Sequence, residues 1–364
     1  MSVGTAPTIG LALSGGGVRA MAFHLGVLRY LAERGVLERV SRVSTVSGGS
    51  LLVGLMLQLS GYKWPSSADF ELVYGKLRAD MCRRGLMWAG LRQLLRPWNW
   101  IYLLSRANLV AKALQGWGVR ASLSELPEIP EWSINGTTAE NGRRFRFKRD
   151  SIGDWQFGYA TAGKFPLAKA MAVSAAIPGG IGPLSIKTTE FEWWKRKSWN
   201  LNVPPEKVVL PFRRLRLYDG GVYDNLGLEP FFDVGTQRPK VQNLSIYVSD
   251  AGAPLTTGRI ALGLSPWRLI RLADIMTEQS RALRVRAFYQ FLQESPWPAG
   301  AYAYIGTTMP GEDEAEARLA RSFRTSLRRL KPDQFDAIAK HGYAVAQGVE
   351  MQHRFLERFG AAAQ

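Results

Sequence analysis

The chain has 364 residues, 46% of them hydrophobic and 21% charged, so it can bury a large core and is neither a disordered chain nor a mini-protein. Its 47 Lys and Arg against 30 Asp and Glu leave a formal net charge of +17, which predicts an anionic partner. The one cysteine excludes an intramolecular disulfide framework, and no apolar run approaches the about 18 residues that a membrane-spanning helix requires.

Two features indicate where the protein acts. Residues 1–14 contain no charged leader before their short apolar run, so we expect no secretory signal peptide. The single thiol, Cys82, is compatible with a reducing cytosol. We therefore expect a cytoplasmic protein that associates with membranes peripherally, and export by a specialised secretion apparatus stays open.

Alternating strand and helix patterns predict an α/β protein. Strands are expected at 9–13, 40–46, 214–218 and 244–249. Helices are expected at 18–34, 49–59, 269–293 and 312–330. The first strand, the helix after it and the second strand fit one right-handed crossover between parallel strands.

Three consecutive glycines, Gly15, Gly16 and Gly17, connect the first strand to its helix. Such a turn presents backbone N–H groups to negative charge, which is either a cofactor phosphate or the oxyanion of an ester carbonyl under attack. A dinucleotide site would need an acidic residue at the end of the second strand. The chain has Ser47 at that point, which favours hydrolysis over redox chemistry.

Ser47 follows a strand and precedes Gly48 and Gly49, the pattern of a nucleophile elbow. The elbow needs small residues two positions either side of the nucleophile, because strand and helix approach closely there. Gly49 meets that need, whereas Thr45 departs from it. The alternative is that Ser47 is an ordinary helix N-cap.

A basic segment rich in tryptophan, residues 81–120, contains no Asp or Glu. Its apolar residues from Met87 to Trp98 have helical spacing, which predicts an amphipathic helix that Pro97 ends or kinks. That helix either contacts an anionic bilayer or packs its apolar face on the core. The charged stretch 193–199 is expected to be an exposed loop with interfacial aromatics. The candidate membrane contacts are Arg92, Arg96, Trp98, Trp100, Trp193 and Trp194.

A serine nucleophile needs a base, and the chain has three histidines. His24 lies within a predicted helix, and His341 and His353 lie in a charged C-terminal region, so an ordinary Ser-His-Asp triad has little support. Asp219 ends a predicted strand and precedes Gly220 and Gly221, which makes it the best candidate base. Burial would have to raise its pKa for it to act near neutral pH. Asp250, at the end of another strand, is the reserve candidate.

Three motifs together resemble the patatin-like phospholipase family. They are Gly15-Gly-Gly-Val-Arg-Ala20, Val46-Ser47-Gly-Gly49 and Asp219-Gly-Gly221, in the order that this family has. The stretches 170–178 and 222–227 resemble further family blocks, so the resemblance spans roughly residues 8–255.

This resemblance implies a three-layer α/β/α fold with a mainly parallel central sheet and extra helices. It implies a catalytic domain at 1–255, with basic insertions at about 63–145 and 185–212, and a helical region at 256–364 packed on it. The implied activity is phospholipase A or lysophospholipase cleavage of membrane glycerolipids, with neither metal nor cofactor. The implied residues are Ser47 and Asp219 as a dyad, and Gly15, Gly16, Gly17 and Arg19 at the oxyanion hole.

Two alternatives stay open beside this activity. The first is a catalytically silent module that binds lipid or regulates another protein. The second, remote alternative is a basic nucleic-acid-binding protein, although no motif for nucleic acid is present and none is expected to bind. We also expect a regulatory ligand or protein partner, because an ungated basic phospholipase would endanger the membranes of its own cell.

Overall fold

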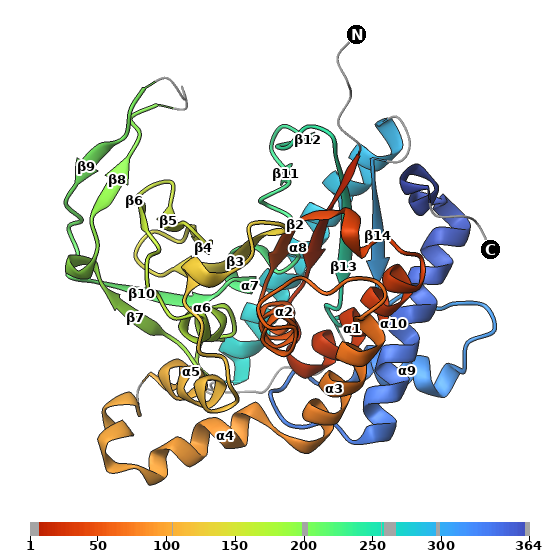
Figure 1. Ribbon diagram of the computed structural model, residues 1–364, viewed down its shortest axis with the longest axis horizontal. Helices are drawn as coiled ribbons and strands as arrows, with labels where there is room; N and C mark the ends of the chain where they lie inside the picture. The colour runs from red at the N-terminus through yellow and green to blue at the C-terminus, as the bar shows by residue number, and fades with distance from the viewer. Residues whose placement is uncertain are drawn as a thin grey trace.

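A computed structural model describes residues 7–103, 105–198, 203–255, 257, 267–295 and 299–360 of the protein (Figure 1). Residues 1–6 of the expected leaderless start and Trp199 of the charged stretch lie outside these ranges. The described strands are β1 (Thr8–Leu13), β2 (Val40–Thr45), β3 (Glu131–Thr138), β4 (Arg144–Phe147), β5 (Ser151–Asp154), β6 (Gly158–Thr161), β7 (Leu184–Lys187), β8 (Trp193–Lys195), β9 (Glu206–Val208), β10 (Arg214–Asp219), β11 (Phe232–Asp233), β12 (Arg238–Pro239), β13 (Leu244–Asp250) and β14 (Gly300–Tyr304).

The centre of the sheet is parallel, in the order β14-β13-β1-β2-β3. Beyond β3 the sheet continues antiparallel through β4, β5, β6, β8 and β9, and β10 also pairs with β3 in antiparallel register. The antiparallel strands curve away from the parallel centre on the left of Figure 1. The expected α/β fold with a parallel centre is therefore confirmed.

Side chains alternate between the two faces of the central strands, which produces two apolar layers. Ile9, Leu11 and Leu13 of β1 enter one buried cluster together with residues of α1, α2 and α10. Ile246 and Val248 of β13 enter a second cluster with residues of α8. Helices thus cover both faces of the sheet, as in a three-layer α/β/α protein.

Three of the four helices expected at 18–34, 49–59, 269–293 and 312–330 begin and end within two residues of the expected bounds. The described helices are α1 (Gly17–Glu33), α2 (Gly48–Leu59), α3 (Phe70–Arg83), α4 (Leu86–Arg92), α5 (Arg106–Gly116), α6 (Leu167–Ser174), α7 (Gly221–Asp224), α8 (Trp267–Glu294), α9 (Glu314–Ser322) and α10 (Pro332–His353), with short 3₁₀ turns η1 (Leu37–Arg39), η2 (Gln93–Leu95), η3 (Pro97–Tyr102), η4 (Leu123–Glu125), η5 (Thr188–Glu190) and η6 (Phe355–Phe359).

Two predicted helices are shorter than expected. The amphipathic helix ends at Arg92 and passes through 3₁₀ turns, because Arg96 is extended before Pro97, as a residue before proline prefers to be. The helix predicted at 312–330 ends at Ser322. The chain that follows it is needed elsewhere, since the carbonyl oxygen of Ser326 accepts a hydrogen bond from the N–H of Val18 (2.9 Å).

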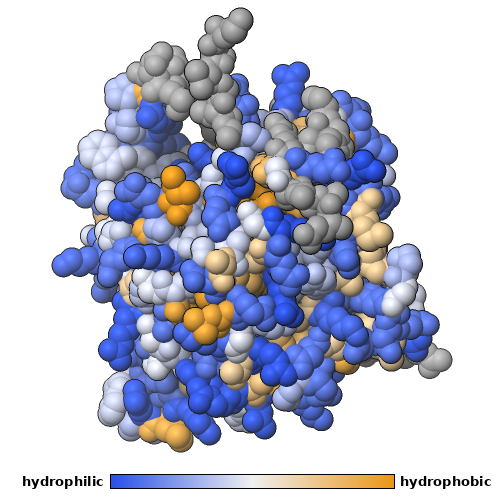
Figure 2. All heavy atoms as spheres, turned by 45° about the vertical axis from the view of Figure 1, so that its right-hand side comes forward, coloured by the Kyte–Doolittle hydropathy of each residue, from blue (hydrophilic) through white to orange (hydrophobic). Residues whose placement is uncertain are grey.

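The C-terminal region takes part in the same sheet and core as the N-terminal strands. β14 pairs in parallel with β13, and α10 lies against α1. The two helices approach closely at Gly26, where a Cβ atom would lie 1.9 Å from the carbonyl oxygen of Ala339. The expected insertion at 63–145 also contains β3, a central strand beside β2. The face drawn in Figure 2 is mainly hydrophilic, with apolar residues in small separate groups.

Candidate active site

Ser47 occupies a strained turn between β2 and α2. Its backbone has φ 50° and ψ −115°, a conformation that a non-glycine residue adopts at a cost of about 1–3 kcal/mol. The turn is tight: a Cβ atom at Gly48 would lie 2.3 Å from the carbonyl oxygen of Gly17, and one at Gly49 would lie 2.6 Å from that of Leu13. This is the local geometry expected of a nucleophile elbow.

Thr45 is accommodated at the elbow because its hydroxyl belongs to a buried hydrogen-bond network. Thr45 Oγ1 accepts from Trp132 Nε1 (2.9 Å) and shares a hydrogen bond with Ser50 Oγ (2.7 Å). Ser50 is bonded in turn to Ser174 Oγ (2.8 Å), which accepts from the N–H of Ser47 (3.0 Å). The residue that breaks the glycine pattern therefore helps to hold the strained backbone of Ser47.

Asp219 lies at the end of β10, close enough to the Ser47 side chain for that side chain to affect the pKa of its carboxyl group. Both residues are buried, and the N–H of Gly221 donates to Asp219 Oδ1 (2.7 Å). Burial raises the pKa of Asp219 to about 7, against the Gly221 hydrogen bond and the Ser47 side chain, which lower it. A carboxyl group that titrates near neutrality can accept a proton from a hydroxyl and return it.

The turn after Asp219 has to be glycine on steric grounds. A Cβ atom at Gly220 would lie 2.5 Å from the carbonyl oxygen of Asn135, and one at Gly221 would lie 2.7 Å from Oδ1 of Asn225. The predicted acid turn is therefore a place where the backbone of β3 and the side chain of Asn225 approach the chain closely.

The glycine turn lies directly against the elbow. An ideal Cβ atom at Gly15 would be 3.1 Å from Cβ of Ser47, so the two segments are in contact. The N–H of Gly15 is already bonded to the carbonyl oxygen of Asn225 (3.0 Å). Gly15 is therefore not a free donor. The expectation that its N–H belongs to the oxyanion hole is wrong.

Gly16 and Gly17 have φ of 144° and 61°, which glycine adopts without strain. None of the backbone hydrogen bonds in the described residues uses either N–H group. These two donors stand at the beginning of α1, where the helix dipole adds to their attraction for negative charge.

Arg19 supports the glycine turn from behind. Its guanidinium donates to the carbonyl oxygen of Ala251 (Nη2, 2.9 Å) and to that of Phe323 (Nη1, 2.5 Å). The side chain is 3% exposed, and burial lowers its pKa to about 10. Arg19 therefore positions the backbone that presents Gly16 and Gly17.

Three residues around the site were not predicted as site residues from the sequence. Asn225 lies between the glycine turn and the acid turn, and its side-chain oxygen fills the space that a side chain at Gly15 or Gly221 would take. Asn135 Nδ2 donates to the carbonyl oxygen of Thr45 (2.9 Å), and Ser174 bonds the N–H of Ser47. Asn225 and Ser174 lie in stretches that resemble the family, and this was the only signal.

The other candidate bases are occupied elsewhere. Asp250 accepts hydrogen bonds from Arg281 Nη1 (2.6 Å) and from the Tyr302 hydroxyl (2.6 Å). It therefore forms a structural ion pair, and its prediction as the reserve base is wrong. His24 bonds Ser249 Oγ (2.7 Å) and the carbonyl oxygen of Ser14 (2.9 Å), and burial lowers its pKa to about 4, which confirms its place in the core.

His341 and His353 are not placed to act as the base of Ser47. Both ring nitrogens of His341 are bonded, to Glu312 (2.5 Å) and to the carbonyl oxygen of Ile305 (2.7 Å). His353 is exposed at the end of α10. In the described part of the chain, no group of three or more His, Cys, Asp and Glu residues could hold a metal ion.

The expected membrane contacts divide into two groups. Arg92 and Arg96 are exposed, Trp98 and Trp100 are 68% and 64% exposed, and Trp194 is partly exposed. Trp193 is buried, because it lies in contact with the rings of Phe145 and Phe191 and donates to the carbonyl oxygen of Thr188, so that candidate is wrong. Of the helices described, none has the length and apolar character that crossing a bilayer requires.

A strained serine on a strand-to-helix turn, beside a buried acid and a glycine turn in an α/β/α fold, has the local geometry of a nucleophile elbow. The family model of patatin-like phospholipases matches residues 11–232. The chain therefore belongs to the patatin-like phospholipase family, whose class of activity is lipid acyl hydrolysis.

Solved structures support the same fold. Human GIVD cytosolic phospholipase A2 matches 97% of this chain and 60% of its own, with a TM-score of 0.57 and 14% identity. The same human enzyme in complex with methyl gamma-linolenyl fluorophosphonate matches 98% of this chain and 59% of its own, with a TM-score of 0.56 and 14% identity. The protein thus spans about 60% of the human chain. A search of curated protein sequences gave no match.

Proposed function

We propose that this protein hydrolyses fatty-acyl esters of membrane glycerolipids, with Ser47 as nucleophile and Asp219 as base. One observation carries the proposal: a hydroxyl on a strained turn lies beside a buried carboxyl group whose pKa is raised to about 7. An ordinary capping serine needs neither the strain nor the acid. Membership of the patatin-like phospholipase family supports lipid as the substrate class.

In the proposed reaction, Asp219 accepts the Ser47 proton while Oγ attacks the ester carbonyl carbon. The N–H groups of Gly16 and Gly17 bind the oxyanion, and each such donor contributes about 3–4 kcal/mol in comparable enzymes. Asp219 then returns the proton to the departing alcohol, leaving Ser47 acylated. Water then attacks the acyl-enzyme while Asp219 accepts its proton, and Asp219 returns that proton to Ser47 Oγ as the fatty acid is released.

The silent-module alternative predicts the same fold without turnover. A protein that only binds lipid has no use for a neutral-range carboxyl group beside a strained hydroxyl, since burial of an uncompensated acid costs stability. The nucleic-acid alternative uses the net charge alone and leaves this pair without a purpose.

Replacement of the two residues tests the proposed dyad. Ser47→Ala and Asp219→Asn should each lower fatty-acid release from phospholipid vesicles by about 1,000-fold or more. Only Ser47→Ala should abolish covalent labelling by an alkyl fluorophosphonate outright, since it removes the atom that is labelled. The control is Ser124→Ala, an exposed serine of η4, which should retain the wild-type rate. Equal release from wild type and Ser47→Ala would refute the proposal.

The proposal also assigns a lipid-facing surface, defined as α4 through η3. Large apolar side chains are exposed along it, and Arg92 and Arg96 lie among them. Exposed aromatics interleaved with cations suit the boundary between anionic headgroups and acyl chains. In Figure 1 this segment projects from the body below α5. Its exposed apolar residues are Trp88, Leu91, Leu95, Trp98, Trp100 and Ile101.

Vesicle binding tests the lipid-facing surface separately from catalysis. Trp98→Ser together with Trp100→Ser should weaken binding to vesicles containing phosphatidylserine about tenfold, equivalent to about 1.4 kcal/mol. The matched control is Trp155→Ser, an exposed tryptophan outside this surface. Unchanged binding by the double variant, or an equal loss in the control, would remove the surface from the proposal.

A further inference from the structure

An apolar cavity begins one helical turn from the proposed nucleophile. The N–H of Leu51 donates to the carbonyl oxygen of Ser47 (3.0 Å), and Leu51 and Leu55, one turn further along α2, both line the cavity. Val18, which directly follows the glycine turn, lines it from α1. The cavity therefore lies beside the first turns of the two helices that follow the glycine turn and the serine turn.

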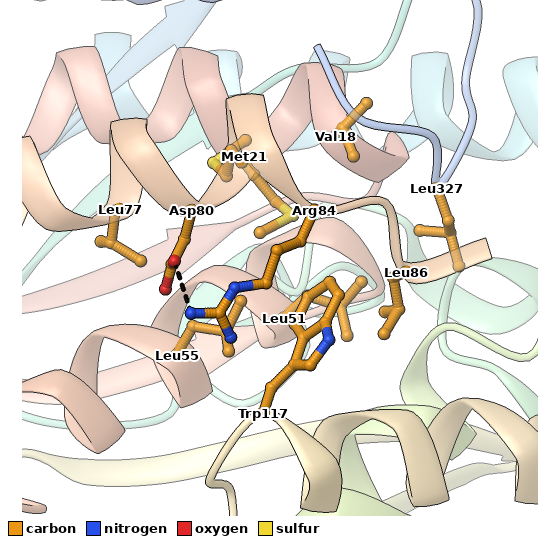
Figure 3. A pocket seen from close by; sticks show the side chains of 11 residues that line it. Val18, Met21, Leu51, Leu55, Leu77, Asp80, Arg84, Leu86, Trp117 and Leu327 are labelled. Carbon is orange, nitrogen blue, oxygen red and sulfur yellow. Dashed lines mark ion pairs between the residues drawn. The ribbon is translucent and has the colours of Figure 1, made fainter. Parts of the chain in front are cut away.

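The far walls of the cavity come from distant parts of the chain. Leu77 of α3, Trp117 after α5 and Leu327 of the C-terminal segment close it, as Figure 3 shows. Almost every lining side chain is hydrophobic and buried. The exceptions are Asp80 and Arg84, which form an ion pair (2.8 Å) at the edge.

Arg84 closes one side of this cavity without entering its apolar interior. Its guanidinium is held by Asp80 and lies 5.8 Å from the ring centre of Trp117. The ion pair is partly exposed, with side-chain exposures of 33% and 26%, so water still reaches it. A long flexible side chain in this position can swing aside at low cost.

We infer that this cavity receives the fatty-acyl chain of the ester that Ser47 attacks, an inference that rests on the proposed function. Leu55 lies eight residues beyond Ser47 on α2, a rise of about 12 Å, which an extended acyl chain of medium length spans. Each methylene group buried there is removed from water, which favours binding of a long acyl chain. Apart from the Asp80–Arg84 pair and the indole N–H of Trp117, no lining side chain has a nitrogen or oxygen atom that could bind a polar substrate group.

The cavity is closed in the present structure. Its free volume of about 20 Å³ has room for one water molecule rather than an alkyl chain. Entry of the chain therefore parts Arg84 from Trp117 and shifts the flexible side chains of Met21 and Met81, which also line the cavity. Selectivity for acyl length then depends on how deep the chain can reach toward Leu55.

Filling the deep end of the cavity tests this inference. In Leu55→Trp, hydrolysis of p-nitrophenyl palmitate should fall at least tenfold, while hydrolysis of p-nitrophenyl butyrate stays within about twofold of wild type. The matched control is Leu72→Trp, which adds the same ring to α3 at a residue 64% exposed, and it should alter neither rate. Circular dichroism melting confirms that the variants are folded.

The outcomes separate this inference from the function on which it rests. Failure of the wild type to cleave either ester would count against the proposed function. A folded Leu55→Trp protein with an unchanged palmitate-to-butyrate ratio would overturn the acyl-chain site alone. If Leu55→Trp does not fold, Trp117→Ala decides: widening the wall should raise the palmitate-to-butyrate ratio at least threefold, and no change in the ratio would overturn the site.

Discussion

Two acidic turns of this protein have the same local form and opposite surroundings. Asp219 ends β10 and Asp250 ends β13, and both carboxylates are buried. Each accepts a hydrogen bond from the N–H of the glycine two residues later, Gly221 at 2.7 Å and Gly252 at 2.8 Å. By local sequence and turn geometry the two residues are equivalent candidates.

The two acids differ in the partners of their carboxyl groups. Asp250 is bonded by Arg281 and by the Tyr302 hydroxyl, so its charge is compensated within the protein. Asp219 has the neutral Ser47 hydroxyl as a partner, and burial raises its pKa to about 7. The same turn therefore holds an ion pair in one place and an acid with a raised pKa in the other, because the neighbouring charge decides which form of the acid is stable.

The largest effect on stability is expected when Asp250 loses the cation that compensates its charge. Arg281→Met leaves Asp250 buried without a cation and should lower the free energy of unfolding by about 3–5 kcal/mol, measured by urea denaturation. Adding Asp250→Asn to the same protein should restore part of this loss, since no buried charge then remains. A loss below about 1 kcal/mol in the single variant would show that the two turns differ less than their contacts indicate.

The uncompensated acid should control the rate through its protonation. Because Asp219 must be ionised to accept the Ser47 proton, kcat/KM should rise about tenfold per pH unit up to about pH 7 and level off above it. Hydrolysis of a soluble short-chain ester between pH 5 and 9 measures this. A rate independent of pH from 5 upward would contradict the raised pKa.

The raised pKa of Asp219 also predicts that the stability of the protein falls with pH, whereas its rate rises. The folded-state pKa of Asp219, about 7, lies above its ordinary value of 3.8, so folding favours the protonated acid. That contribution is full below about pH 4 and is lost as the pH rises through 7. Asp219→Asn, which stays neutral, should therefore gain melting temperature relative to wild type at pH 8 compared with pH 5. An equal difference at both pH values would refute the shift.

Local patterns were sufficient for the elements that carry the site. The strands ending near Thr45, Asp219 and Asp250 were predicted to within one residue at their ends, since period-two hydrophobicity and following glycines are local signals. The pairing of Ser47 with a distant acid followed from the order of three glycine-containing motifs. The early end of α9 at Ser322 was not predicted, because the residues that follow it bond the segment after the glycine turn instead of continuing the helix.

By itself, the sequence determined the α/β fold and the serine turn, because each depends on residues adjacent along the chain, and it favoured a carboxylate over a histidine as the proposed base. Only the tertiary structure decided that the N–H of Gly15 is committed to Asn225, that Trp193 is buried, and that Arg281 compensates Asp250. These outcomes depend on which groups meet across the fold. A hydrogen bond or an ion pair needs both partners, and the second partner here comes from a segment far away in the chain.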